Sequence, residues 1–280
     1  MSSTLVTPEQ LAAQLASWVV IDCRFSLADT THGRRVYAES HIPGARYAHL
    51  DDDLSSPKSA TTGRHPLPDL ATFCAKLGAW GITPATQVVV YDDSFGSMAV
   101  RLWWLLRGLG HRKVALLDGN FPKWTREKRP VDTDEPVVIP TTYPVPANVD
   151  WGVDASAVET IRQSPAHKLI DARPEMRFTG EVEKIDPVPG HIPGAINWVF
   201  EENLDLDGTY LPADELREQY KQLLAGVAPE NVVHTCGSGV TACHNVLAME
   251  IAGLPGSKLY PGSWSEWITD PSRPVATGEA

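Results

Sequence analysis

The chain has 280 residues, and the usual size of a domain therefore predicts about two domains. It has no apolar run near the roughly 18 residues that span a bilayer, and its amino-terminal MSSTLVTPEQ lacks the basic and apolar regions of a secretory signal. The formal net charge of -11 argues against nucleic acid or an anionic membrane as the main partner. It does not exclude a small anionic substrate, because the local field in a pocket outweighs the net charge.

Short apolar runs alternate along the chain with segments that have the composition of helices. The strand-like runs include 88–91, 113–117, 232–235 and 257–260, and the helix-like segments include 97–108 and 240–252. Alternation of this kind predicts an α/β fold, in which a parallel sheet is covered by helices on both faces.

Two stretches of the sequence recur. VVIDCR…HIPGARY in 19–47 resembles KLIDAR…HIPGAINW in 168–198, and 88–124 aligns without a gap with 231–267. A period of more than a hundred residues indicates two copies of one domain rather than a solenoid. We therefore expect an amino-terminal domain over 1–135, a proline-rich linker over 136–152 and a carboxyl-terminal domain over 153–280.

The two copies differ where chemistry is expected. The gapless alignment pairs Cys236 with Asp93, so the first copy has no thiol at the matching place. The first copy also carries seven more residues between its HIPGA histidine and the next strand, His41 to Val88 against His191 to Asn231. The surplus falls in 50–68, a loop that we expect to contribute to a site shared by the two domains.

Cys236 lies at the end of the strand-like run in NVVHTCGSGVTACHN, before a glycine-rich turn and a predicted helix. Gly237 and Gly239 allow successive backbone N–H groups to point inward, and the helix start adds a partial positive charge. Stabilising a thiolate by two pKa units takes about 2.7 kcal/mol, which a helix terminus and charge-assisted N–H bonds can supply together. This pattern predicts a reactive thiolate rather than an inert buried cysteine.

The other cysteines have no such setting. Cys243 falls on the following helix among apolar residues, and Cys23 and Cys74 are expected to be structural. Four cysteines are too few and too scattered for a disulfide framework, and we expect free thiols in a reducing, cytoplasmic compartment.

The duplication, the paired HIPGA motifs and the CGSGVTA loop resemble the two-domain rhodanese family, and within it the mercaptopyruvate sulfurtransferases, over essentially the whole chain. Thiosulfate sulfurtransferases of this architecture usually carry basic residues in the loop, and this loop has none. The resemblance implies tandem rhodanese-like domains without a cofactor or metal. It also implies sulfur transfer from mercaptopyruvate through a Cys236 persulfide to a small thiol, to thioredoxin or to cyanide.

The same resemblance implies roles for further residues. Arg177 in EMRFTG matches the arginine that binds the donor's carboxylate, and Lys184 replaces a second arginine of the family. The loop from Gly237 through Gly239, Val240 and Thr241 would bind the substrate. A proton relay is implied for three residues, Ser238, His65 and Asp51. As alternatives, Ser238 could cap the helix and His65 could be a loop residue.

Other chemistries share parts of this pattern. A phosphatase with a similar thiolate needs an arginine closing a C-x5-R loop, and the residue at that place is Ala242. A cysteine hydrolase needs a neighbouring histidine base, and His244 falls on the helix. A metal site lacks the required Cys and His spacing. A thiosulfate:cyanide sulfurtransferase of the same mechanism, or a persulfide carrier that serves a protein partner, remain the alternatives.

Overall fold

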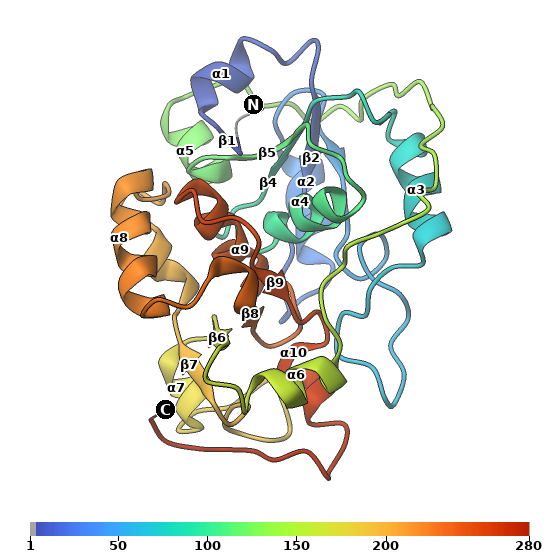
Figure 1. Cartoon of the computed structure of the whole chain (residues 1–280). Helices are drawn as coiled ribbons and strands as arrows, with labels where there is room; N and C mark the ends of the chain where they lie inside the picture. The colour runs from blue at the N-terminus through green and yellow to red at the C-terminus, as the bar shows by residue number, and fades with distance from the viewer. Residues whose placement is uncertain (1–3, 280) are drawn as a thin grey trace. The chain divides into compact units, whose positions relative to one another are not determined.

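The computed structural model describes residues 4–279, which form two compact units (Figure 1). The first unit comprises the chain up to Ser56, Leu67–Asp150 and Asp205–Tyr210. The second unit comprises Pro57–Pro66, Trp151–Leu204 and the chain from Leu211 onward. Each unit therefore includes one short segment that the sequence repeat would assign to the other copy.

The first unit contains a five-stranded parallel sheet with the order β1-β5-β4-β2-β3. Its central strands are buried along their whole length, which explains why they consist of continuous apolar runs rather than of alternating residues. The strands are β1 (Leu5–Val6), β2 (Val19–Asp22), β3 (Arg46–Tyr47), β4 (Val88–Tyr91) and β5 (Val114–Leu117). The helices are α1 (Pro8–Ala12), α2 (His32–Glu39), α3 (Leu70–Ala79), α4 (Ala99–Gly108) and α5 (Asn120–Arg126).

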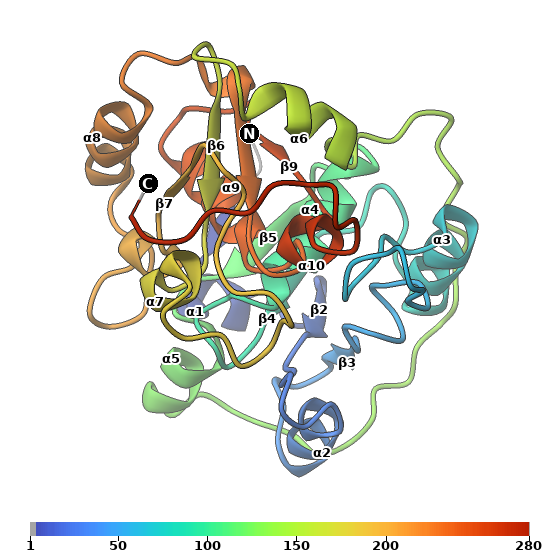
Figure 2. The same cartoon turned by 90° about the horizontal axis from the view of Figure 1, so that it is seen from below.

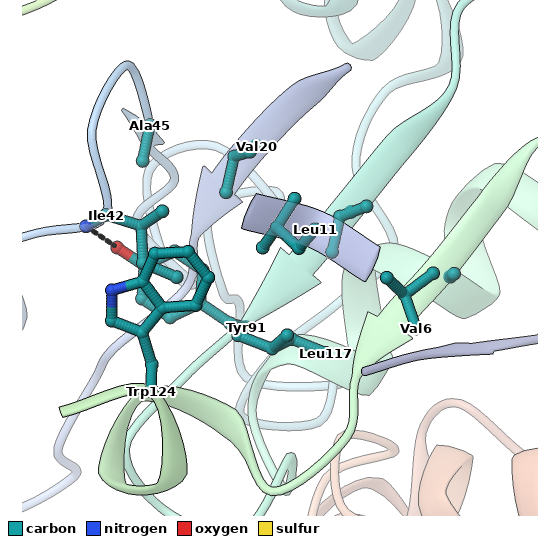
Figure 3. Packing of buried hydrophobic residues seen from close by; sticks show 10 residues of the cluster. Val6, Leu11, Val20, Ile42, Ala45, Tyr91, Leu117 and Trp124 are labelled. Atoms are coloured by element: carbon teal, nitrogen blue, oxygen red, sulfur yellow. Dashed lines mark hydrogen bonds between the residues drawn. The ribbon is translucent and has the colours of Figure 1, made fainter. Parts of the chain in front are cut away.

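Helices cover both faces of this sheet. On one face, Val20 of β2 and Leu117 of β5 pack in a cluster with Leu11 of α1 and Trp124 of α5 (Figure 3). α4 packs against β4 and β5. Burying an apolar side chain of this size contributes about 1.5–3 kcal/mol, so this cluster is a major part of the unit's stability.

The second unit contains a four-stranded parallel sheet with the order β7-β6-β8-β9. The strands are β6 (Lys168–Asp171), β7 (Ala195–Asn197), β8 (Val232–Thr235) and β9 (Lys258–Leu259). The helices are α6 (Ala155–Ile161), α7 (Glu175–Thr179), α8 (Ala213–Leu224), α9 (Ala242–Ile251) and α10 (Ser263–Trp267), with 3-10 turns at η1 (Phe200–Asn203) and η2 (Pro229–Asn231).

Alternate residues of β8 face opposite layers of helices. Val233 packs in a cluster with Val158 of α6 and Trp264 of α10. The next residue, His234, places its Nε2 3.2 Å from the sulfur of Met249 on α9, and α8 packs beside α9 (Figures 1 and 2). The expected α/β architecture, with parallel sheets between helices, is therefore confirmed in both units. No helix among residues 4–279 is long and apolar enough to cross a membrane.

The Asp-x-Arg motif forms the same buried ion pair in both copies. Arg24 lies 2.6 Å from Asp22, and Arg173 lies 2.8 Å from Asp171. Each guanidinium also donates to the carbonyl just before the HIPGA histidine, at Ser40 and Gly190. The motif thus ties the HIPGA turn to the end of a central strand.

The two HIPGA histidines are structural. His41 Nδ1 lies 2.7 Å from the carbonyl of Tyr37, and His191 Nδ1 lies 2.8 Å from the carbonyl of Phe178. Each imidazole also stacks on the ring of that same residue, with centroids 4.1 and 3.8 Å apart. Equal roles in both copies explain why these histidines recur in the copy that has no thiol.

The loop that follows β4 is built around a buried carboxylate. Asp92 is 0% exposed and accepts four backbone N–H groups, all at 2.8 Å. The donors are Ser94, Gly96, Met98 and Ala99. Burial raises the pKa of Asp92, and these bonds oppose that shift. The N–H groups before α4 thus bind an anion that the loop itself supplies.

Replacing Asp92 should destabilise the protein. Asp92→Ala leaves four N–H groups, two of them buried, without an acceptor, so the free energy of unfolding should fall by about 2–5 kcal/mol in urea titrations. The control is Asp93→Ala, because Asp93 is partly exposed and its ion pair with His32 spans 3.9 Å. A similar loss in both variants would contradict this account of the loop.

Candidate active site

Cys236 follows directly on β8, at the carboxyl end of the second unit's sheet. Its N–H donates to the hydroxyl of Ser263 at 3.1 Å, and its carbonyl accepts the N–H of Trp264 at 3.0 Å. The start of α10 therefore holds the backbone of Cys236 from both sides. The residue is only 2% exposed, and all four cysteines are free and buried.

The strand register identifies the counterpart of Cys236 in the first unit. Asp22 pairs with Tyr91, and the equivalent Asp171 pairs with Thr235, so the next residues along, Asp92 and Cys236, correspond. The gapless alignment of Cys236 with Asp93 is therefore wrong by one residue. The reason is that residues 92–98 separate β4 from α4, whereas only 236–241 separate β8 from α9.

The contacts of the two loops agree with this correspondence. The N–H of Asp92 donates to Asn120 Oδ1 at 3.1 Å, as that of Cys236 does to Ser263 Oγ. Asn120 and Ser263 share an unusual positive φ, of 53° and 52°. The two loops are therefore versions of one structure, with a carboxylate in the first and a thiol in the second.

Several N–H groups of the second loop have no acceptor in the described part of the chain. Among residues 4–279, no acceptor takes the backbone N–H of Gly237, Ser238, Val240 or Thr241. Gly239 has a φ of +71°, and a Cβ there would lie 2.1 Å from the carbonyl oxygen of Pro261. The tight turn thus requires glycine at 239, and it leaves donors beside the thiol that could bind an anion.

Two of the expected site residues are brought together. His65 Nδ1 lies 2.7 Å from the hydroxyl of Ser238, and the residues are 3% and 5% exposed. His65 belongs to Pro57–Pro66, which is part of the second unit. Ser238 therefore does not cap α9; its hydroxyl is paired with an imidazole. Asp51 belongs to the first unit and is placed only within it, so its part in the relay stays a prediction.

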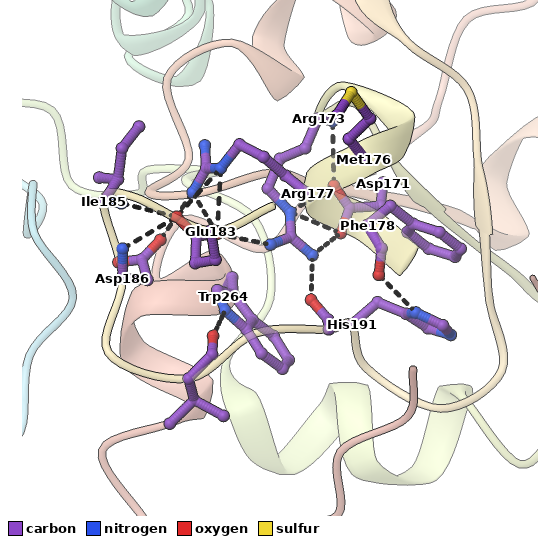
Figure 4. A network of polar contacts seen from close by, with 12 residues as sticks. Asp171, Arg173, Met176, Arg177, Phe178, Glu183, Ile185, Asp186, His191 and Trp264 are labelled. Atoms are coloured by element: carbon purple, nitrogen blue, oxygen red, sulfur yellow. Dashed lines mark hydrogen bonds and ion pairs between the residues drawn. The ribbon is translucent and has the colours of Figure 1, made fainter. Parts of the chain in front are cut away.

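Arg177, on α7, is held by two carboxylates (Figure 4). Its Nη2 lies 2.9 Å from Glu183 and 2.9 Å from Asp186, and its Nε lies 3.0 Å from Glu183. Burial acts to raise the pKa of Glu183, but hydrogen bonds from Arg177 and from the N–H groups of Asp186 and Ile185 outweigh burial and lower it. The ionised Glu183 therefore fixes the Arg177 guanidinium.

A second arginine, Arg64, was not predicted and lies over the same loop. Its Nη1 binds Asp186 Oδ1, and its Nη2 lies 2.9 Å from where a Cβ on Gly237 would be. The only local signal in the sequence was its position next to His65. Lys184, by contrast, is exposed and forms no hydrogen bond or ion pair with any residue of the described chain.

Arg173 supplies a buried positive charge close to the thiol. Burial acts to lower the pKa of Arg173, but the charges of Asp171, Cys236 and Glu183 outweigh burial, and the pKa is raised. Its guanidinium lies 5.0 Å from the ring centroid of Trp264 (Figure 4).

The turn at Gly239 yields a stability prediction. Gly239→Ala should lower the free energy of unfolding by at least about 3 kcal/mol, because backbone strain adds to a clash with the Pro261 carbonyl. The control is Gly226→Ala in the same unit, where φ is +88° and nothing lies within 4 Å. That variant should lose only about 1–2 kcal/mol in urea titrations. Equal losses would mean that the close approach to Pro261 costs nothing.

Comparison with known proteins places this arrangement in a family. The rhodanese-like domain matches twice, over residues 7–127 and 154–270. The "Probable 3-mercaptopyruvate sulfurtransferase" of Pseudomonas aeruginosa is 48% identical, covering 99% of this chain and 99% of its own length. The thiosulfate sulfurtransferase of Cricetulus griseus is 35% identical over 93% of this chain and 89% of its own. The structure of 3-mercaptopyruvate sulfurtransferase from Leishmania major is similar with a TM-score of 0.84 and 32% identity, covering 95% of this chain and 74% of that one. The chain therefore belongs to the rhodanese-like domain family, of which it carries two tandem copies.

Proposed function

We propose that this protein is a sulfurtransferase that moves a sulfur atom from 3-mercaptopyruvate to an acceptor through a persulfide on Cys236. One observation carries the proposal. The Cys236 thiol follows β8 at the position where the corresponding loop of the first unit has the Asp92 carboxylate, and backbone N–H groups beside the thiol have no acceptor among the described residues. Relatives that are named sulfurtransferases, covering nearly the whole chain, support the same chemistry.

The reaction takes place in two steps. The Cys236 thiolate attacks the donor's sulfur, an S–S bond forms, the donor's C–S bond breaks, and pyruvate leaves as its enolate. An acceptor thiolate or cyanide then attacks the outer sulfur, which regenerates the Cys236 thiolate. Both enzyme forms are anionic sulfur species, and the same N–H groups can stabilise each of them.

Ser238 and His65 would handle the proton. The enolate must gain a proton to become pyruvate, and a hydroxyl 2.7 Å from an imidazole nitrogen provides a path for one. In this proposal the Ser238 hydroxyl protonates the enolate and His65 replaces the proton. Asp51 would orient His65 as the third member of the relay.

The charges around the loop favour mercaptopyruvate over thiosulfate. The loop itself has no basic residue, and the three arginines near it are each paired with a carboxylate, as Arg173–Asp171, Arg177–Glu183 and Arg64–Asp186. Such a set carries as many negative as positive charges, and so attracts a dianion less than an unpaired cluster would. A single carboxylate can still bind the arginine N–H groups that remain free.

Access to the thiol requires a small movement. Cys236 is 2% exposed, so a donor reaches the sulfur only when a neighbouring side chain shifts. Arg64 and Arg177 reach the loop with the far ends of their side chains. The acceptor that we propose is a small thiol, a protein thiol such as that of thioredoxin, or cyanide.

The proposal is tested by the donor's effect on the intact protein. Treatment with mercaptopyruvate should add the mass of one sulfur atom, which peptide mass spectrometry should locate on Cys236. Cys236→Ser should lose both the added mass and the turnover, whereas Cys243→Ser should keep most of both, since Cys243 is a buried α9 residue that donates to the Gly239 carbonyl. Steady-state rates should show a higher kcat/KM for mercaptopyruvate than for thiosulfate. A clear preference for thiosulfate would reject mercaptopyruvate as the donor.

The Ser238–His65 pair is tested separately. Ser238→Ala and His65→Gln should each lower kcat about 10²–10⁴-fold with mercaptopyruvate, because positioned proton transfer contributes about that much. The double variant should lose little more than either single variant, since the two groups act as a unit. Additive losses would show that the pair does not work together.

A further inference from the structure

Two guanidinium groups from distant parts of the sequence reach the space above Gly237. A Cβ on Gly237 would lie 2.9 Å from Arg64 Nη2 and 3.7 Å from Arg177 Nη1. The φ of Gly237 lies outside the left-handed region, so the backbone does not demand glycine there. The absence of a side chain at 237 instead leaves room for the two arginines.

Two of the nitrogens that reach this space, Arg64 Nη2 and Arg177 Nη1, have no partner among residues 4–279. Arg177 uses Nε and Nη2 for Glu183 and Asp186, and Arg64 uses Nη1 for Asp186. Among residues 4–279, nothing accepts a hydrogen bond from Arg177 Nη1 or Arg64 Nη2, and Arg64 Nε is buried without a partner. Both side chains keep some exposure, 18% for Arg64 and 17% for Arg177, so these two free donors are available to an acceptor that comes from outside.

Asp186 sets the spacing between the two arginines. Its side chain is 3% exposed, and its two oxygens bind different guanidinium groups, Oδ1 that of Arg64 and Oδ2 that of Arg177. The bridged pair presents one free N–H edge from each arginine towards the same point. The two oxygens of a carboxylate match such a pair of donors.

The segment that delivers Arg64 is fixed to the catalytic loop's surroundings. The N–H of Arg64 donates to Ser265 Oγ at 2.9 Å, and a Cβ on Gly63 would lie 2.7 Å from the Gly262 carbonyl oxygen. The next residue, His65, is bonded to Ser238. One short segment thus provides both the imidazole and the second guanidinium.

From these contacts we infer that Arg64 is a specificity-determining residue, which binds the carboxylate of a 2-oxo-3-thiol acid donor together with Arg177. Arg64 takes the place of the second basic group expected at Lys184, which is exposed. This inference rests on the proposed function and names the residue that recognises the donor's acid group. With Arg64 in this role, donors that carry a carboxylate are better substrates than neutral thiols of the same shape.

The test compares two donors in Arg64→Ala and Arg64→Lys. One donor is mercaptopyruvate, and the other is mercaptoacetone, which has the thiol and the ketone but no carboxylate. Arg64→Ala should raise the half-saturating concentration of mercaptopyruvate about 10- to 100-fold. The half-saturating concentration of mercaptoacetone should change less than about twofold. The rate at which a preformed persulfide passes its sulfur to a thiol should also change less than about twofold. Arg64→Lys should be intermediate, because lysine keeps the charge but loses the planar fork.

The control is Arg162→Ala, which removes another arginine of the second unit from its ion pair with Glu159 on α6. It should change neither donor's kinetics. The inference would be overturned if Arg64→Ala weakened the kinetics equally for both donors, or changed neither. It would also be overturned if the effect on mercaptopyruvate appeared in Lys184→Ala instead. A wild-type protein that takes no sulfur from mercaptopyruvate would overturn the proposed function as well.

Gly237→Ala provides a second, independent test. The added methyl group would lie too close to Arg64 Nη2, at 2.9 Å, and at ordinary contact distance from Arg177 Nη1, at 3.7 Å. It should therefore displace the end of Arg64 and raise the half-saturating concentration of mercaptopyruvate. In the Arg64→Ala background the same change should add less than about twofold, because the displaced side chain is already absent. Fully additive effects would overturn the role of Arg64.

Discussion

The loop that links a central strand to the helix behind it presents several backbone N–H groups in both units. In the first unit the partner is Asp92, which takes four of them at 2.8 Å. In the second unit the loop is one residue shorter, a thiol stands in place of the carboxylate, and no residue that the structure describes accepts several of the N–H groups. In the proposed mechanism, these backbone N–H groups would stabilise the sulfur anion without a basic residue in the loop.

The charged side chains around this loop serve to position one another. Each arginine near the thiol is paired with a carboxylate, and Asp186 joins two of them. The ion pairs hold the guanidinium groups in fixed directions, so little conformational entropy remains to be lost when an anion binds. Pairing also limits the net positive charge, so recognition depends on the direction of a few N–H groups rather than on overall attraction.

Much of this structure could be predicted from the sequence. The parallel strands are buried on both faces and therefore appear as continuous apolar runs, and the strand, glycine loop and helix around Cys236 are local features. The sequence could not show that the counterpart of Cys236 is Asp92 rather than Asp93. A one-residue difference in loop length does not change the pattern of apolar residues, and only the pairing of the strands shows it. Arg64 was missed because its partners, Asp186 and Gly237, are more than a hundred residues away in the sequence.

Pro57–Pro66 lies in the first copy of the repeat but belongs to the second unit. Asp205–Tyr210 lies in the second copy but belongs to the first unit. A chain cut in the linker would keep Cys236 on the carboxyl-terminal fragment but leave Arg64 and His65 on the other piece. Duplication normally yields modules that recombination can separate and reuse. Here each copy supplies a segment to the compact unit that the other copy forms, so a single copy would yield an incomplete unit.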